Sequence, residues 1–378
     1  MASLLKITLF IGLNFCLNFV SAGDDHLGKS AAESLLVPKS YVLNEFPLIN
    51  SLNRDVRIKS KADHYKEISK LIGSDAKVKS PEDEGFIDNN LNSEWQEFRH
   101  VVMQKLNEEI FNEWPKSKNN LTIQENYHND SKDVQFSVIK FSIEKFIRFP
   151  LYLVHRKDVN LEDLDLVVLN ILDENGWPEF VSTYGKIFPK AFDSNVDINT
   201  HEKESFESNQ RMFQNQDWGM AYFSPRGVGA MAKMYGSLSK EEISKRYNLF
   251  DKSLEGMQVF DIIQSVNALR LIEGMKNVPL WMQSHDEMSA NLLYASLYIK
   301  NLKRLDLHGL PESHNQGPAY IGIMNYIDLP QCLALVVERT RVVLYQPDAD
   351  YNPFAKNVIE ALNFNNKSLA VRKTLNFE

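Results

Sequence analysis

The sequence predicts an α/β fold in which two antiparallel strands lead into a mostly parallel, doubly wound sheet. Around residues 134–138 and 147–153, apolar and polar residues alternate, which is typical of neighbouring antiparallel strands. Farther along, residues 166–169 and 218–223 form short, nearly continuous apolar runs, as expected of strands buried on both faces. Helical patterns separate these later runs, and strands that alternate with helices build a parallel sheet.

The first residues resemble an export signal. Lys6 precedes an apolar run from Ile7 to Val20, and residues 20–22, Val-Ser-Ala, form a small-residue cleavage pattern. This run is shorter than the ~20 residues that a spanning helix needs, so a cleaved signal is favoured over a membrane anchor. We therefore expect residues 1–22 to be removed and the mature chain to begin at Gly23. The protein would be secreted or periplasmic, without a stable membrane span.

A polar extension and a helix are expected before the sheet. Residues 23–92 contain only short apolar patches and are expected to be loosely structured. A capping box at Ser93 starts a helical pattern of apolar residues that ends at Pro115. Because the helix has one apolar face, we expect residues 93–130 to form a helical segment that covers the following domain. Residues 131–378 would then form the α/β domain.

The remaining elements of that domain follow in order. Further strands are expected at 278–282, 304–307 and 341–345, and helices at 259–269, 289–298 and 352–362. The last helix has Asn352 as its cap and Pro353 in its first turn.

Composition and charge exclude several classes of function. The formal net charge is −8, and no Lys/Arg cluster is interleaved with aromatic residues, so no nucleic-acid partner is expected. After signal cleavage Cys332 is the only cysteine, so no internal disulfide can form and the core must supply stability. No two histidines are four residues apart, as in a helical zinc motif. We expect neither a metal site nor a cofactor.

Four segments resemble the α/β-hydrolase superfamily, in the order that the superfamily has them. Leu166–Trp177 resembles its third strand and oxyanion-hole loop, and Trp218–Gly229 resembles its fourth strand with a Pro-Arg-Gly-x-Gly turn. Leu254–Asp261 is similar to the helix before the nucleophile strand in acetyl xylan esterase-like bacterial secreted proteins. Val278–Ser289 stands where strand, nucleophile elbow and helix meet. This resemblance runs from about Ser93 to the C-terminus and implies an α/β-hydrolase fold.

The resemblance also implies where a cleft would lie. Its oxyanion-hole loop would contain Glu174, Asn175, Gly176 and Trp177, and Glu287 would follow the nucleophile position. We therefore expect these five residues to line the cleft.

The elbow departs from the superfamily pattern Gly-x-Ser-x-Gly. Ser284 and Met288 replace the two glycines, and Asp286 takes the position of the nucleophile. An aspartate nucleophile is known in related hydrolases that open carbon–halogen bonds or epoxides, and it needs a base to activate water. Ser284 is the alternative nucleophile if the register differs. A left-handed, strained Asp286 would support retained catalytic geometry, whereas a relaxed turn would favour a degraded site.

No histidine stands where the superfamily has its base. The loop expected after the last strand, Tyr345–Tyr351, contains none, and none follows it. His308 and His314 follow the sixth strand, and the C-terminal edge of the sheet would bring them near Asp286. His285 is adjacent in sequence, but consecutive side chains cannot align as nucleophile, base and acid. His308 and His314 are thus the candidate bases.

Three functions remain open. The favoured hypothesis is an esterase-derived pseudoenzyme, exported and with a degraded triad, that binds a small molecule or carbohydrate in the old cleft. The second is an active carboxylic ester hydrolase, similar to acetyl xylan esterases, that acts on acylated carbohydrate. The third is a hydrolase with Asp286 as its nucleophile. Fold alone does not decide between them.

Overall fold

A computed structural model describes residues 45–52, 84–115, 121–144, 147–194, 196–198, 201–346, 353–365 and 367–373. The predicted signal peptide and cleavage site, most of the polar extension, Asn352 and most of the loop after β8 lie outside these residues. Within them, no helix combines the length and apolar content needed to cross a bilayer.

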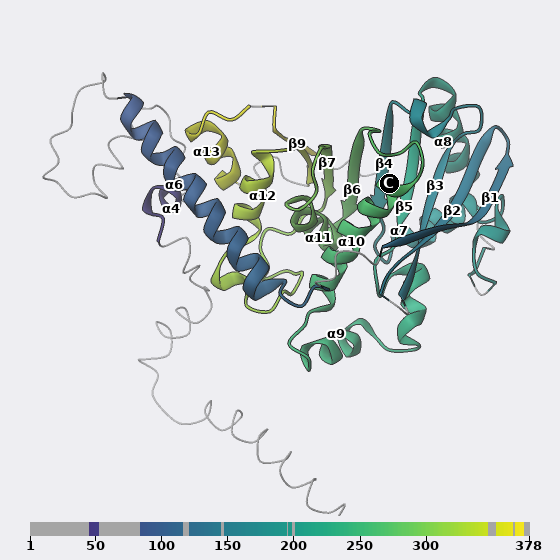
Figure 1. The fold of residues 1–378 in the computed structure, drawn as a ribbon, viewed down its shortest axis with the longest axis horizontal. Helices are drawn as coiled ribbons and strands as arrows, with labels where there is room; N and C mark the ends of the chain where they lie inside the picture. Colours follow the sequence, from purple (N-terminus) through teal and green to yellow (C-terminus); the bar gives the residue numbers. More distant parts are fainter. Residues whose placement is uncertain are drawn as a thin grey trace, which may run out of the picture. The chain divides into compact units, whose positions relative to one another are not determined.

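A mixed sheet forms the centre of the protein (Figure 1). In the described part of the chain its strand order is β1-β2-β3-β5-β4-β6-β7-β8-β9. β1, β2, β3 and β5 are antiparallel neighbours, and the pairs from β5 through β4 to β9 are parallel. The strands are β1 (Thr122–Ser131), β2 (Val134–Glu144), β3 (Ile147–Arg156), β4 (Leu166–Ile171), β5 (Trp218–Phe223), β6 (Leu280–His285), β7 (Leu302–His308), β8 (Arg341–Gln346) and β9 (Leu369–Lys373). The predicted fold class is confirmed.

Helices pack on both faces of this sheet. The α-helices are α4 (Pro47–Ser51), α6 (Glu84–Lys105), α7 (Gly176–Tyr184), α8 (Lys203–Asn215), α9 (Lys240–Asn248), α10 (Leu254–Leu271), α11 (Asp286–Ser296), α12 (Leu329–Val337) and α13 (Pro353–Ala361). A π-helical turn, Leu106–Ile110, extends α6, and short 3₁₀ turns lie at Leu161–Asp163, Pro189–Ala191, Gly229–Tyr235 and Ile323–Asn325.

The buried residues form two apolar clusters, one on each face of the sheet. Alternate residues of β3 divide between them, since Leu151 and Leu153 join the larger cluster and Tyr152 and Val154 join the smaller. The larger cluster holds apolar residues of α6 and of α10 to α13, and the smaller holds those of α7 and α8. This two-sided burial explains why β4 is an apolar run with every residue buried.

Helix α6 covers the end of the domain near α12 and α13, as the apolar pattern predicts (Figure 1). Trp95 Nε1 donates to Glu338 Oε2 at 3.2 Å, beyond the end of α12. Part of the predicted loose extension is ordered, because the backbone amides of Leu48 and Ile49 in α4 donate to Glu94 at 2.8 and 3.1 Å.

Several element boundaries differ from the sequence expectation. α6 begins at Glu84 rather than near Ser93. β1 begins at Thr122, inside the range assigned to the helical segment, and its mostly exposed residues give no apolar alternation. The helix expected at 289–298 begins at Asp286, directly after β6. That last difference places Asp286 in the turn itself.

Candidate functional site

The candidate site lies at the junction of β6 and α11. His285, the last residue of β6, is extended, with φ −123° and ψ 151°, whereas the next residue, Asp286, has φ +50°. The left-handed region costs a non-glycine residue roughly 1–2 kcal/mol, so it persists only where the surrounding structure enforces it. A strand, a strained turn and a helix form the backbone of a nucleophile elbow. Asp286 therefore has the strained conformation, not the relaxed one.

A glycine from the neighbouring strand makes room for the Asp286 side chain. Gly309, directly after β7, has φ +61°, and a Cβ atom there would lie 2.6 Å from Asp286 Oδ1. Gly317 has φ +108°, and a Cβ atom there would lie 3.0 Å from Glu287 Oε1. The elbow itself lacks glycines. Instead, glycines in the segment after β7 let the backbone there pass close to the side chains of Asp286 and Glu287.

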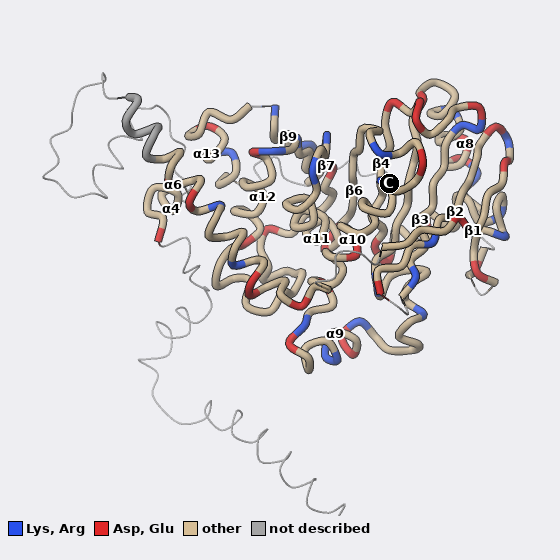
Figure 2. The backbone as a smooth tube through the Cα atoms, viewed as in Figure 1, with Lys and Arg blue, Asp and Glu red and all other residues tan. Residues whose placement is uncertain are grey.

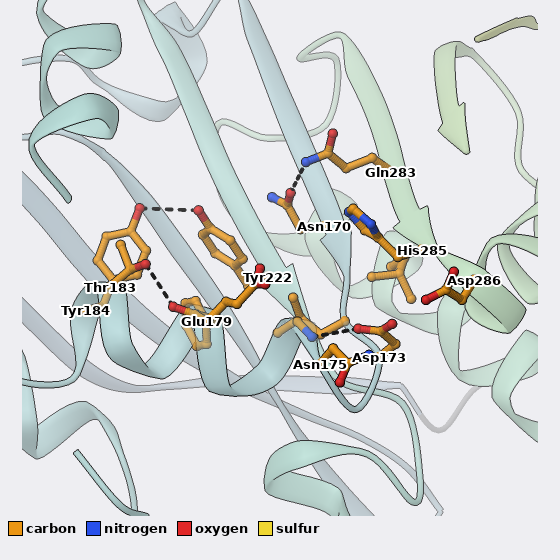
Figure 3. Close-up of a pocket in the computed structure, with 14 residues that line it drawn as sticks. Asn170, Asp173, Asn175, Glu179, Thr183, Tyr184, Tyr222, Gln283, His285 and Asp286 are labelled. Carbon is orange, nitrogen blue, oxygen red and sulfur yellow. Dashed lines mark hydrogen bonds between the residues drawn. The ribbon is translucent and has the colours of Figure 1, made fainter. Parts of the chain in front are cut away.

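A cavity of about 380 Å³ opens beside Asp286 (Figure 3). It is lined by the ends of β4, β5 and β6, the loop after β4, and α7. Three carboxylates line it, those of Asp173, Glu179 and Asp286, and no lysine or arginine is among its described lining residues. The cavity therefore favours a neutral or cationic ligand over an anionic one.

The walls of this cavity carry paired hydrogen-bonding groups. Gln283 Nε2 donates to Asn170 Oδ1 at 2.5 Å, and the hydroxyls of Tyr184 and Tyr222 lie 3.3 Å apart. Burial raises the pKa of Tyr222 to about 12, so its hydroxyl stays protonated. Amides and protonated hydroxyls both donate and accept, which suits a ligand rich in hydroxyl groups.

A second cavity of about 300 Å³ lies on the other side of Asp286. It shares Asp173, Asn175 and Asp286 with the first, and it adds Glu174 and Glu287. Lys240 of α9 reaches into it, with Nζ 2.7 Å from Glu287 Oε2 and 3.9 Å from Glu174 Oε1. This lysine joins the loop after β4 to the residue after Asp286.

The predicted cleft residues are thus largely brought together. Glu174, Asn175 and Glu287 line the second cavity, and Asn175 and Gly176 line the first. The Gly176 amide donates to Asp173 Oδ1 at 2.6 Å, so it is already bonded in this structure. Trp177 lines neither cavity; its ring packs against Gly229, where a Cβ atom would lie 2.4 Å away.

Comparisons with known proteins were made for sequence and for structure. No family model matches the chain, and no curated protein matches its sequence. A proposed acetyl xylan esterase from Bacteroides fragilis NCTC 9343 superposes with a TM-score of 0.54 at 9% identity, over 86% of this chain and 84% of that one. A promiscuous CE15 esterase from the marine bacterial metagenome gives a TM-score of 0.51 at 11% identity, over 73% and 86%.

The chain has an α/β-hydrolase fold. In this fold a nucleophile, an acid and a histidine follow one another along the chain, with the nucleophile at the elbow. Asp286 occupies the elbow here, and a further strand, β9, follows the strand that the sequence suggested was last. No histidine follows β9 either.

Ser284 does not line either cavity. It is 1% exposed, and its hydroxyl donates to the carbonyl of Ile171 at 2.8 Å. Ser289 in α11 is also buried, and its hydroxyl lies 2.8 Å from the carbonyls of both Ser284 and His308. The Ser284 hydroxyl links β6 to β4. The Ser289 hydroxyl links α11 to the ends of β6 and β7. At this turn the exposed side chains are therefore those of His285 and Asp286.

His314 is buried away from both cavities, at 8% exposure. Its Nε2 lies 2.9 Å from the Tyr294 hydroxyl, and its Nδ1 lies 2.8 Å from the Pro318 carbonyl. Both ring nitrogens of His314 are thus bonded within the protein. His314 does not line the cavities beside Asp286, where the sequence placed it as a candidate base.

His308 stands in a row of three stacked rings across the edge of the sheet. Strand register places His285, His308 and Tyr345 side by side. Ring centroids are 4.3 Å apart between His285 and His308, and 4.2 Å apart between His308 and Tyr345. Burial and the neighbouring His285 lower the pKa of His308 to about 4, so it is neutral at pH 7. The rings of His285 and Tyr345 cover the two faces of the His308 imidazole.

Sequence reasoning missed several residues of the cavities. Asn170 is the polar residue of an otherwise apolar strand, and that contrast could have identified it. Gln283 is the first of three polar residues that end β6. Glu179 and Lys240 carried no such signal, because the fold alone brings α7 and α9 to the cleft.

Among the described residues, no cluster of three or more His, Cys, Asp or Glu side chains could hold a metal ion.

Proposed function

We propose that this chain is an exported α/β-hydrolase-fold pseudoenzyme that binds a neutral, hydroxyl-rich ligand beside Asp286 and does not hydrolyse carboxylic esters. The observation that carries the proposal concerns the elbow. Asp286 retains the strained turn, which is the outcome expected of preserved catalytic geometry, but among the described residues no histidine forms an ion pair or hydrogen bond with its carboxylate. The missing base therefore carries the proposal, against the evidence of the turn.

Ester hydrolysis at an elbow needs an activated nucleophile and a proton acceptor. A hydroxyl becomes a nucleophile only when an adjacent base removes its proton. Ser284 and Ser289 are buried with their hydroxyls on backbone carbonyls. His285 is the histidine that lines the first cavity, and its ring stacks on His308 and lies apart from the Asp286 carboxylate (Figure 3). These positions support binding without acyl transfer.

The cavity chemistry supports a carbohydrate as the ligand. Carboxylates accept hydrogen bonds from sugar hydroxyls, and the Gln283 amide can donate as well as accept. The Asn170 amide holds Gln283 in place, because its Nδ2 donates to the carbonyls of Val168 and Ala221 and its Oδ1 accepts from Gln283. Phe180 and Tyr222, stacked at 4.5 Å, add apolar surface to the same cavity. Such a combination of apolar surface and few placed polar groups is typical of small-ligand sites. One of the similar structures is named for acetyl xylan, which makes xylan fragments suitable probes.

Calorimetric titration with two oligosaccharides of equal length tests the proposal. Xylotetraose is neutral and tetragalacturonic acid is anionic, so the three carboxylates of the cavity should admit the first and reject the second. Asp286→Asn keeps the side-chain shape and should change xylotetraose affinity less than tenfold. Binding of the anionic sugar with equal affinity would contradict the proposed ligand class.

A hydrolase that uses Asp286 as nucleophile is the second candidate, because Asp286 retains the strained backbone of an elbow. The carboxylate oxygen would attack carbon, open an epoxide or displace halide, and leave an ester on Asp286. Without a base this ester would persist and be visible by intact mass spectrometry. We expect no adduct with styrene oxide or 1-bromobutane, and an adduct absent from Asp286→Asn would favour this second candidate.

A further inference from the structure

An exposed apolar pair lies outside the cleft, at the end of α9. Leu249 and Phe250 follow the last turn of this helix and are 81% and 76% exposed. Of the exposed large apolar side chains in the described residues, these two are the most exposed. Figure 1 shows α9 set apart from the sheet. Scattered exposed apolar residues are ordinary, whereas contiguous exposed apolar area can mark an interaction site.

Hydrogen bonds hold the apolar pair in a defined turn. The Leu249 amide donates to the carbonyl of Lys245 at 3.3 Å, and the Phe250 amide donates to that of Tyr247 at 2.9 Å. The Tyr247 hydroxyl lies 2.7 Å from that of Tyr235, and it accepts from the buried Arg226 guanidinium at 3.4 Å. Leu249 and Phe250 are therefore exposed on a backbone that hydrogen bonds hold in place.

Positive charge lies next to this pair. α9 has Glu241 and Glu242 in its first turn, and Lys245 and Arg246 in its last. Figure 2 shows both signs of charge on this helix. Lys245 and Arg246 are exposed, and neither forms an ion pair with a carboxylate of the described residues. Lys245 and Arg246 therefore border the apolar side chains, and so does Lys252. One exposed carboxylate, Asp251, follows Phe250 directly, whereas Glu241 and Glu242 stand at the other end of the helix.

We propose that Lys245, Arg246, Leu249 and Phe250 form a docking surface for an anionic lipid bilayer. Leucine and phenylalanine side chains insert at the boundary between headgroups and acyl chains, and cations beside them bind lipid phosphates. A stable contact with a second copy would need about 800 Å² on each partner, far more than two side chains offer. The size and charge of this tip fit interfacial insertion.

This surface would bring the cleft close to the bilayer. Nine helical residues span about 13 Å, and Lys240 at the start of α9 contacts Glu287 beside Asp286. The proposal does not rest on what the cleft binds, because docking uses side chains that line neither cavity.

Vesicle sedimentation tests this proposal with the chain from Gly23, the expected mature form. Vesicles of phosphatidylglycerol and phosphatidylcholine in equal parts should retain the protein, and phosphatidylcholine alone should retain at least tenfold less. Raising NaCl from 0.1 to 0.5 M should release it, because salt screens the cationic contacts. Retention that is equal on both vesicles and insensitive to salt would overturn the proposal.

Matched variants assign the binding to α9. Leu249→Ser with Phe250→Ser should lower the fraction bound at least tenfold, and Lys245→Glu with Arg246→Glu should abolish it. Ile321→Ser removes another exposed apolar side chain, at 52% exposure, and should bind as the wild type does. Unchanged binding by the Leu249/Phe250 variant would overturn the assignment. So would a concentration-dependent dimer that this variant abolishes, which would identify a second copy as the occupant.

Discussion

Replacing Gly309 by alanine should displace the Asp286 side chain in the cleft. It should lower the free energy of unfolding only by about the cost of placing alanine in a left-handed backbone conformation. Gly309 has φ +61°, and Gly322 has φ +76° at a site where the nearest atom to an added Cβ is 3.6 Å away. Alanine in the left-handed region costs roughly 1–2 kcal/mol at either position. At Gly309 the added Cβ would also lie 2.6 Å from Asp286 Oδ1. That oxygen ends an exposed side chain, so it can move aside.

We therefore expect Gly309→Ala and Gly322→Ala to lower the free energy of unfolding by similar amounts, within about 1 kcal/mol of each other, in urea titrations. Only Gly309→Ala should weaken xylotetraose binding. A hydrogen bond to a charged group contributes about 1.5–3 kcal/mol, so displacement of the Asp286 carboxylate should lower affinity roughly 10- to 150-fold. Adding Asp286→Ala should make Gly309→Ala nearly neutral for binding. Equal affinity of both glycine variants would refute the reasoning.

Further predictions concern stability and pH. Arg226 donates to buried Asp261 through Nε and Nη2 at 2.7 Å. Asp261→Asn should cost up to about 3–5 kcal/mol in urea unfolding, because the buried guanidinium then keeps only the partly exposed Glu144 as an anionic partner. Glu109→Gln breaks the exposed pair with Lys105 and should leave the free energy of unfolding nearly unchanged. The pKa of His308 is depressed to about 4 in the folded state, so the unfolded chain binds more protons below its ordinary value of 6.5. Stability should fall as pH drops from 6.5 towards 4, and this fall should be smaller in His308→Phe, which keeps the stack. An equal pH dependence in both proteins would contradict the buried, neutral imidazole.

The position of the elbow could be predicted from sequence because the apolar residues 278–282 indicate a strand and Asp286 follows them at the place of the motif's serine. The conformation of the turn could not, since it depends on Gly309 from another strand. β1 escaped prediction because its side chains face solvent and lack apolar alternation.

The histidines show a similar division between local and distant information. Their sequence positions placed His308 and His314 at one edge of the sheet, as candidates near Asp286. Which way each ring points depends on strand register for His308 and on the partners Tyr294 and Pro318 for His314. Such contacts join residues far apart in the chain, and no local pattern encodes them.

If the elbow binds its ligand without hydrolysing esters, acetylated xylotetraose should keep its acetyl groups. Acetate release can be followed by proton NMR at a protein concentration equal to that of the substrate. We expect release at the rate of the protein-free sample, for the wild type and for Asp286→Asn alike. Saturable release by the wild type that Asp286→Asn abolishes would contradict it.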